Sequence, residues 1–407
     1  MLQVKSAADA LSLLEEEIKP LDKGALILPL AEALGYIAAA DICCEEIIPP
    51  FNRSTVDGYA LRACDSFGAG AGSPGRLKLR GRVEMGQKPG FSLAPGEAAY
   101  VPTGGCLPAG ADAMIMLEYS EDIGDGYIYF YKAAAPGNQL IFAGDDAKPG
   151  EVLVARYQRL QPHHVGLLAA AGISQAPVFA PLSVGIISSG DELVDIKTVP
   201  KNGQIRDVNS YLLAAQVEEA GAKARCYGIA PDNAEHLLSL CVSALAECDM
   251  LLLSGGSSVG QQDYSPWVLK NLPHSRLLLH GLAVKPGKPT LLALAGDKPV
   301  FGLPGHPLSA YFICRVFVLR ALRLLQGQAT TPPRCITATL TLNYPSNAGR
   351  AEYLPVALSA SPAGWLAKPI FNKSGLICLL KQASGYICIS REQEGLAKGQ
   401  EVEVELL

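Results

Sequence analysis

From residue 182 to residue 328, short apolar runs alternate with longer segments whose apolar positions recur at helical spacing. The apolar runs predict buried strands, and the longer segments predict helices that cover the resulting sheet. This alternation is typical of a largely parallel sheet, in which ligands bind beyond the carboxyl ends of the strands. Asn209 is predicted as a helix N-cap and Gly221 as the residue that ends the same helix. We predict strands at 182–188, 223–229, 250–254, 277–282 and 299–303, and helices at 210–220, 234–247, 265–272 and 308–325.

The segments before and after this region follow other patterns. Ser6 and Asp9 are spaced as a capping box at the start of an N-terminal helix, and a second helix is predicted at 29–34. Pro162 starts a third helix that ends near residue 171. Between residues 49 and 132, glycine and proline separate short apolar runs such as 98–101, 113–116 and 127–130, which predicts a small β domain. Further strands are predicted at 336–342, 352–358, 366–370 and 387–390.

These patterns predict a multidomain α/β plus β protein, with a three-layer α/β domain at its centre. The β domain lies between two helical segments, so we interpret it as an insertion. We predict a linker domain formed by 1–48 and 141–180, an inserted β domain at 49–140, the α/β domain at 181–328 and a C-terminal β-barrel or β-sandwich domain at 329–407.

Composition narrows the class of protein. Apolar residues make up 49% of the 407 residues and charged residues 18%, which is typical of a folded chain. The formal net charge of −5, without a basic stripe, argues against a nucleic-acid partner. No apolar run is long enough to cross a membrane. The 11 cysteines follow no metal-binding or disulfide spacing, which favours reduced thiols in a cytoplasmic protein.

Polar loops follow the predicted strands at 188–192, 254–260, 285–289 and 302–307. Glycine lets backbone amides approach an anion closely, and serine and lysine side chains donate to phosphate. Aspartate and glutamate in the same loops would repel phosphate unless a divalent cation bridged the two. Any one of these loops could be an ordinary turn, and its lysines could be solvated. Because four such loops follow successive strands, we predict a site for a phosphorylated compound and a metal ion.

Several sequence motifs, in these loops and in the preceding β domain, resemble those of one known family. PPFNRSTVDGYALR at 49–62 and Pro102-Thr103-Gly104 lie in the predicted β domain, and Gly144-Asp145-Asp146 follows it. The α/β domain contributes SGDEL, SGGSSVGQQDY, KPGKP and GLPGHPLSA, in this order. Over essentially its whole length, the chain resembles the molybdopterin molybdenumtransferases of the MoeA and gephyrin E-domain family.

The resemblance implies a function in molybdenum cofactor biosynthesis. Members of the family insert molybdenum from molybdate into adenylated molybdopterin, and AMP leaves with the help of Mg²⁺. It also implies a molybdopterin-binding-like α/β domain and a homodimer whose site is shared between subunits. Contact with the molybdopterin adenylyltransferase is a further implied partner.

Roles for individual residues follow from the resemblance. The metal ligands would be Asp191, Glu192 and Asp263. The catalytic set would comprise Asp57, Thr103, Asp191, Glu192, Asp232 and Asp263. Substrate and anion binding would fall to Ser189, Gly190, Ser254, Gly255, Gly256, Ser258, Lys285, Lys288, Pro304, Gly305, His306, Pro307, Arg350 and Ser374.

The chain departs from the family pattern at four positions. His306 stands where the family usually has asparagine, which changes the shape of the side chain and adds pH sensitivity. Ile141 stands where arginine is common, which removes a charge. Ser189 replaces threonine, and Ser257 replaces valine. Two alternatives remain, a molybdopterin adenylyltransferase and a non-catalytic binding or scaffold paralogue such as the receptor-anchoring domain of gephyrin.

Overall fold

The structure is a computed structural model that describes residues 4–255, 264–329, 332–371 and 375–407. The chain forms two compact units. One contains Met1–Leu26, Gly35–Ile37 and Phe179–Leu407, and the other contains Ile27–Leu34 and Ala38–Val178. The finer division into four domains stays a prediction.

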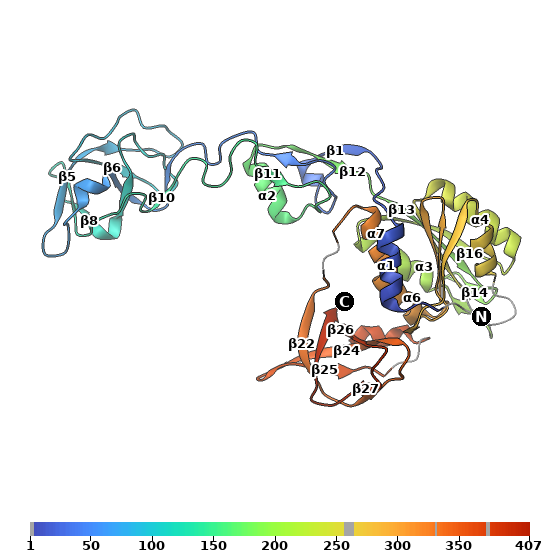
Figure 1. The fold of residues 1–407 in the computed structure, drawn as a ribbon. Helices are drawn as coiled ribbons and strands as arrows, with labels where there is room; N and C mark the ends of the chain where they lie inside the picture. The colour runs from blue at the N-terminus through green and yellow to red at the C-terminus, as the bar shows by residue number, and fades with distance from the viewer. Residues whose placement is uncertain (1–3, 256–263, 330–331, 372–374) are drawn as a thin grey trace. The chain divides into compact units, whose positions relative to one another are not determined.

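The first unit contains a six-stranded sheet (Figure 1). Its strands, in spatial order, are β16 (Lys223–Ala230), β13 (Ser183–Ser189), β17 (Met250–Ser254), β21 (Lys298–Leu303), β20 (Leu291–Ala295) and β18 (Ser275–His280). The first four are mutually parallel, whereas β20 is antiparallel to both of its neighbours. Since β20 is the reversed strand, β18 runs in the same direction as the first four. The loops that follow β13, β17, β18 and β21 therefore leave from the same edge of the sheet.

Helices cover both faces of this sheet, and Figure 1 shows α1 and α4 on opposite sides of it. Met250 and Leu252 of β17 pack into the core that includes α1, α3, α6 and α7. Leu251 and Leu253 pack into the other core, against α4 and α5. Alternate side chains of a strand point to opposite faces, so a fully apolar strand fits a sheet buried on both sides. The helices are α1 (Ala7–Glu17), α3 (Asn209–Glu219), α4 (Ala234–Glu247), α5 (Ser265–Asn271), α6 (Pro307–Ile313), a π-helical segment (Cys314–Val318) and α7 (Leu319–Leu325).

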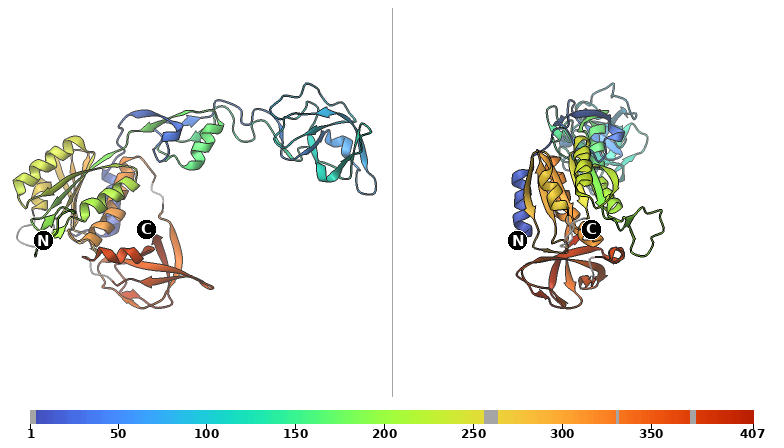
Figure 2. Two further views of the ribbon diagram at one scale, coloured as in Figure 1. Left: turned by 180° about the vertical axis from the view of Figure 1, so that it is seen from behind. Right: turned by 90° about the vertical axis from the view of Figure 1, so that its right-hand side faces the viewer.

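The C-terminal domain is a closed barrel, drawn in orange and red in Figure 2. Its sheet runs β24–β25–β22–β28–β26, and pairing of β26 with β24 closes it. The short strand β19 leaves the α/β domain and pairs in parallel with β24. Phe312 of α6 stacks on Tyr353 and meets Tyr386 edge to face, so aromatic packing also joins the two domains. The strands are β19 (Val284–Lys285), β22 (Cys335–Leu340), β23 (Tyr344–Pro345), β24 (Ala351–Ser361), β25 (Gly364–Pro369), β26 (Gly385–Ile389), β27 (Gly395–Leu396) and β28 (Glu401–Leu406), with a 3₁₀ helix at Ile377–Gln382.

The second unit has its own six-stranded sheet, whose apolar core includes Leu61, Leu77, Ile128 and Phe130. Its strands, in spatial order, are β7 (Ala113–Met116), β4 (Gly58–Leu61), β6 (Glu97–Val101), β5 (Gly75–Arg82), β9 (Tyr127–Phe130) and β8 (Ser120–Asp122). Two-stranded sheets pair β1 with β12, β2 with β11 and β3 with β10. The remaining elements of this unit are α2 (Pro162–Ala170), β1 (Ala25–Pro29), β2 (Ile42–Cys43), β3 (Arg53–Ser54), β10 (Leu140–Ile141), β11 (Val152–Val154), β12 (Gln175–Phe179) and the 3₁₀ helices Leu30–Glu32, Ala63–Ser66 and Leu117–Tyr119. The first unit also contains a two-stranded sheet of β14 (Leu193–Val194) and β15 (Ile205–Arg206).

Most of the predicted elements are confirmed. The capping box of Ser6 and Asp9 starts α1, Pro162 starts α2, and Gly221 ends α3 with a φ of 82°. The inserted β domain, the three-layer α/β domain and the C-terminal barrel are all present. No helix among the described residues is long and apolar enough to span a membrane. All 11 cysteines are free thiols.

Four local predictions were wrong. Residues 29–34 form the end of β1 and a single 3₁₀ turn, not a helix, because the backbone of Leu30 donates to Ser174 beside it. The apolar run 291–295 was not predicted as a strand, although it forms β20, which runs against the other five strands of a sheet that is otherwise largely parallel as predicted. The strand predicted at 277–282 begins and ends two residues earlier. Asn209 is the first residue of α3, and its side chain caps nothing.

The corner KPGKP packs directly on Ile313, the last residue of α6. Gly287 has a φ of 118°, and a Cβ atom there would lie 2.4 Å from Cδ1 of Ile313. We predict that Gly287→Ala lowers the free energy of unfolding by about 3 kcal/mol, because it combines left-handed strain with a steric clash. The measurement is chemical denaturation. Gly296→Ala is the matched control, since its φ is 62° with no atom within 4 Å of the added Cβ, and it should cost only about 1 kcal/mol. Equal losses for the two variants would show that Ile313 simply moves aside.

Candidate functional site

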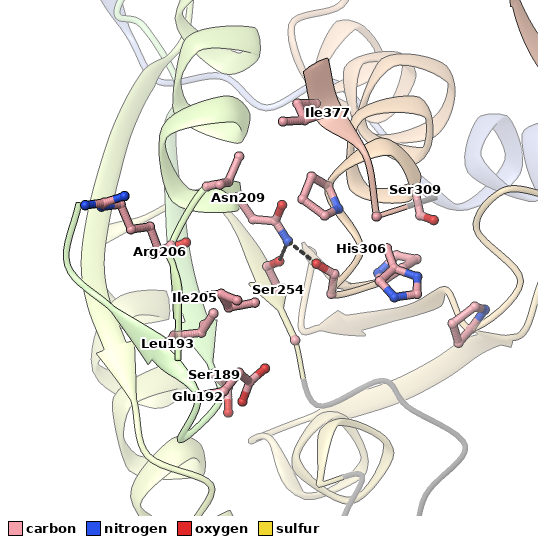
Figure 3. Close-up of a pocket in the computed structure, with 18 residues that line it drawn as sticks. Ser189, Glu192, Leu193, Ile205, Arg206, Asn209, Ser254, His306, Ser309 and Ile377 are labelled. Atoms are coloured by element: carbon pink, nitrogen blue, oxygen red, sulfur yellow. Dashed lines mark hydrogen bonds between the residues drawn. The ribbon is translucent and has the colours of Figure 1, made fainter. Parts of the chain in front are cut away.

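A pocket of about 710 Å³ lies at the carboxyl edge of the α/β sheet (Figure 3). The loops after β13, β17 and β21 contribute to its wall, together with the start of α3 and two residues of the C-terminal domain. A pocket of this size accommodates a compound as large as a nucleotide. Its position agrees with the edge predicted from the sequence. The predicted site residues that line it are Ser189, Glu192, Ser254, Gly255, Pro304, Gly305, His306 and Pro307.

The other predicted residues of the α/β and C-terminal domains that the structure describes lie outside the wall of this pocket. Asp191 and Asp232 are linked to it, because the backbone of Asp232 donates to Asp191 Oδ1 (3.1 Å) and Ser189 Oγ donates to Asp232 Oδ1 (2.9 Å). Lys285 forms an ion pair with Glu352. The predicted residues that do not line the pocket are Gly190, Asp191, Asp232, Lys285, Lys288 and Arg350.

Of the six other predicted residues, two belong to the second unit and four lie outside the described residues. Asp57 and Thr103 belong to the second unit, where the backbone N–H of Thr103 donates to Asp57 Oδ1 at 3.0 Å. That contact brings together two residues that are 46 positions apart. The predicted residues Gly256, Ser258, Asp263 and Ser374 lie outside the described residues.

The loop after β17 approaches the loop after β13 closely at Gly255. This residue has a φ of 100°, and a Cβ atom there would lie 2.0 Å from the carbonyl oxygen of Ser189. Glycine is therefore required at position 255 for steric reasons. The close approach sets the hydroxyls of the buried residues Ser189 and Ser254 into adjacent walls of one pocket.

Asn209 is the pocket residue that the sequence analysis misinterpreted. Its Nδ2 atom donates to Ser254 Oγ (2.7 Å) and to the carbonyl oxygen of Gly305 (2.9 Å), as Figure 3 shows. A carbonyl can only accept, so these contacts fix the orientation of the amide. The side chain thus ties the start of α3 to two loops from neighbouring strands. The spacing Asp207-Val208-Asn209 before a helix is the sequence signal, and it indicates a cap as readily as a site.

A buried polar network underlies this end of the pocket. Asp207 Oδ1 accepts from Ser188 Oγ (2.9 Å) and from the backbone N–H of Ser210 (3.1 Å). The hydroxyls of Ser188 and Ser210 are also 2.9 Å apart. Asp207 therefore performs the capping that was predicted for Asn209, which leaves the Asn209 side chain available to the loops. All of these side chains are buried.

The wall of the pocket combines polar and apolar side chains. Ser189 and Glu192 lie at the end opposite Ile377, as Figure 3 shows. Leu193, Ile205 and Ile377 add apolar surface to the wall. Such a mixed wall suits a ligand that carries both charged groups and less polar parts. Ile377 comes from the C-terminal domain, so the barrel completes the site.

The carboxylates suit a hard cation only in combination with a ligand. Among the residues that the structure describes, no three histidine, cysteine, aspartate or glutamate side chains are grouped to hold a metal ion. Mg²⁺, however, usually keeps several waters and is held by one or two carboxylates together with substrate phosphates. Glu192 in the pocket wall, with Asp191 beside it in the chain, is compatible with that kind of site.

The ion pair of Lys285 is part of a larger buried cluster. Glu352 Oε1 lies 2.7 Å from Lys285 Nζ and also accepts from the hydroxyl of Tyr344 at 2.8 Å. Its other oxygen, Oε2, accepts from Ser346 Oγ at 2.6 Å. Burial, and then the hydrogen bond to Glu352, raise the pKa of Tyr344 well above its ordinary value, so its hydroxyl stays a donor. This cluster connects the KPGKP corner to the barrel.

Comparisons with known proteins agree with this architecture. Family models match the chain over residues 5–172 (MoeA N-terminal region, domains I and II), 185–324 (probable molybdopterin binding domain) and 337–407 (MoeA C-terminal region, domain IV). A relative from Methanocaldococcus jannaschii, named for molybdopterin biosynthesis, is 33% identical, over 93% of this chain and 91% of its own. The chain belongs to the MoeA family.

Two further similarities support that assignment. A molybdopterin molybdenumtransferase of Bacillus subtilis is 30% identical to this chain, and the match covers 93% of this chain and 89% of the relative. The crystal structure of a molybdopterin biosynthesis MoeA protein from Pyrococcus horikoshii OT3 superposes with a TM-score of 0.87 at 32% identity, over 100% of both chains. This MoeA family member therefore matches these relatives over nearly the whole length of the chain.

The amide of Asn209 gives a prediction about the stability of the site. Asn209→Asp preserves the shape of the side chain, but a carboxylate cannot donate to the carbonyl of Gly305. We expect the free energy of unfolding to fall by about 2 kcal/mol, because the hydrogen bond to Gly305 is lost and a carboxylate is buried beside a carbonyl oxygen, although Ser254 can still donate to it. The control is Asn233→Asp, where Oδ1 accepts from the backbone of His236 at 2.9 Å and aspartate caps as well as asparagine. Denaturant titration measures both, and similar losses in the two variants would contradict the role given to Asn209.

Proposed function

We propose that this chain is a molybdopterin molybdenumtransferase, which inserts molybdenum from molybdate into adenylated molybdopterin with Mg²⁺-dependent release of AMP. The observation that carries the proposal is the pocket at the carboxyl edge of the sheet, where hydroxyls, glycine amides and Glu192 come from separate loops. The Bacillus subtilis relative that carries this name matches 93% of the chain, which supports the same activity here.

The pocket residues suggest how the substrate is held. The hydroxyls of Ser189 and Ser254 and the backbone at Gly255 would bind the phosphate groups, because each can donate to an anionic oxygen at close range. The apolar side chains of Ile205 and Ile377, in separate parts of the wall, would contact the less polar parts of the substrate. The pocket would thus orient a phosphoanhydride relative to Glu192.

The carboxylates would hold the cation. Glu192 and Asp191, with Asp263 outside the described residues, are the proposed ligands, and substrate phosphates would complete the coordination. A bound Mg²⁺ would neutralise charge that develops when the phosphoanhydride is cleaved. Asp232 would orient Asp191, since its backbone donates to Asp191 Oδ1.

The lysines and the second unit have roles in the same proposal. Lys285 and Lys288 would bind molybdate or phosphate as point charges. Arg350 and Ser374 of the C-terminal domain would contribute to binding of the same anion. Asp57 and Thr103 would act in the site of a second subunit of a homodimer. Contact with the adenylyltransferase that supplies the substrate is part of the proposal.

One assay separates this function from its alternatives. The full chain is supplied with adenylated molybdopterin, molybdate and Mg²⁺, and AMP is measured over time. A transferase should release AMP only when both molybdate and Mg²⁺ are present. Tight binding of the adenylated compound without AMP release would favour a scaffold paralogue instead, and formation of the adenylated compound from molybdopterin and ATP would favour an adenylyltransferase.

Glu192 gives a second prediction. Glu192→Gln should lower the rate of AMP release by about 100-fold, because the amide is a poor ligand for Mg²⁺. The dissociation constant for AMP measured without Mg²⁺ should change by less than about threefold, since the pocket shape is retained. Glu235→Gln, an exposed change on α4, is the control and should behave as the unchanged chain does. Equal losses in rate and in AMP binding would assign Glu192 to the nucleotide site rather than to the cation.

A further inference from the structure

Glu352 is a buried carboxylate whose cationic partner reaches the surface. The side chain of Glu352 is 4% exposed, whereas that of Lys285 is 42% exposed. Pairing of β19 with β24 places the two residues directly opposite each other in register. The carboxylate therefore stays fixed within the barrel, while the ammonium group has room to turn toward solvent.

Geometry places Glu352 in competition with any anion that Lys285 binds. The Nζ atom already lies 2.7 Å from Glu352 Oε1. An oxyanion accepting from the same ammonium would lie about 2.8 Å from Nζ. The two anionic oxygens could then be separated by no more than about 5.5 Å, the sum of the two contacts. Like charges at this separation repel each other, so the resting ion pair weakens the attraction of Lys285 for an oxyanion.

We propose that Glu352 is an internal counter-ion that an incoming oxyanion must displace from Lys285, and that it thereby sets the affinity of the site for oxyanions. The proposal rests on the proposed function to the extent that Lys285 is taken as the oxyanion ligand. Glu352 acts through Lys285, so it is a positioning residue rather than a catalytic one.

The neighbours of Glu352 make such an exchange feasible. When Lys285 turns away, Oε1 still accepts from Tyr344 and Oε2 still accepts from Ser346 Oγ. A buried carboxylate with no donors would hold its lysine too tightly to release it. The two hydroxyls reduce that penalty because each supplies a hydrogen bond to the charged form.

The test is isothermal titration of the full chain with inorganic molybdate, and separately with sulfate. Glu352→Gln retains the shape and an acceptor for Tyr344 but removes the negative charge. It should bind molybdate about tenfold more tightly than the unchanged chain, because repulsion of the oxyanion is gone. The affinity of Glu352→Gln for sulfate should also be higher than that of the unchanged chain, since the effect depends on the charge of the anion rather than on its metal.

Two further variants make the test independent of one substitution. Tyr344→Phe removes a donor from Glu352, so the carboxylate should hold Lys285 more firmly and molybdate should bind about threefold more weakly. Combining Lys285→Met with Glu352→Gln should abolish the gain seen for Glu352→Gln alone. If Glu352 had only a structural role, Glu352→Gln and Tyr344→Phe would not change the affinity for molybdate in opposite directions.

Glu403→Gln, an equal change of charge at an exposed position of β28 in the same barrel, is the control and should leave the affinity within about twofold. Unchanged or weaker molybdate binding by Glu352→Gln overturns the proposal, as does tighter binding by Tyr344→Phe or no binding by the unchanged chain. AMP release is measured separately on the unchanged chain. If the unchanged chain releases AMP but Glu352→Gln binds molybdate no more tightly, the counter-ion proposal is rejected and the transferase proposal is retained. If Glu352→Gln binds molybdate more tightly but the unchanged chain releases no AMP, the transferase proposal is rejected and the counter-ion proposal is retained.

Discussion

The site depends on one constraint, the burial of β17 on both of its faces. Met250 and Leu252 pack into one helical layer, and Leu251 and Leu253 pack into the other. A strand without a polar face must lie inside a sheet covered on both sides, an environment that is typical of parallel strands. β17 pairs in parallel with β13 and β21, and their loops emerge beside the loop of β17. The pocket is a consequence of that shared direction.

The barrel is attached to this edge by contacts of two kinds. Apolar attachment comes from Phe312, which packs on Tyr353 and Tyr386. Polar attachment comes from Lys285 and the buried Glu352 across the pairing of β19 with β24. Glu352 is buried whereas Lys285 reaches solvent, so removing the lysine leaves a buried charge without its cationic partner, and the pair fixes the geometry of this junction. The KPGKP corner therefore belongs structurally to both domains, which is how one loop can serve the site and also hold the barrel.

Much of the fold could be predicted because its signals are local. Periodicity located β17 and α4 to the residue, and the capping box at Ser6 located the start of α1. The loops that carry Ser189, Ser254 and Gly305 were placed correctly at one edge of the sheet. Prediction failed where a local signal was ambiguous. The run 291–295 is too short to indicate the direction of a strand, and that direction was decided by pairing with β21 and β18.

The sequence by itself determined the order of the elements, the three kinds of domain and the loops that carry the candidate chemistry. Those features follow from spacing along the chain, which a sequence contains completely. Only the tertiary structure decided which side chains are partners. Asn209 bonds to Ser254, 45 positions away, and to Gly305, 96 positions away, and Lys285 meets Glu352 in another domain. Such pairings depend on how separate elements pack, so no local pattern encodes them.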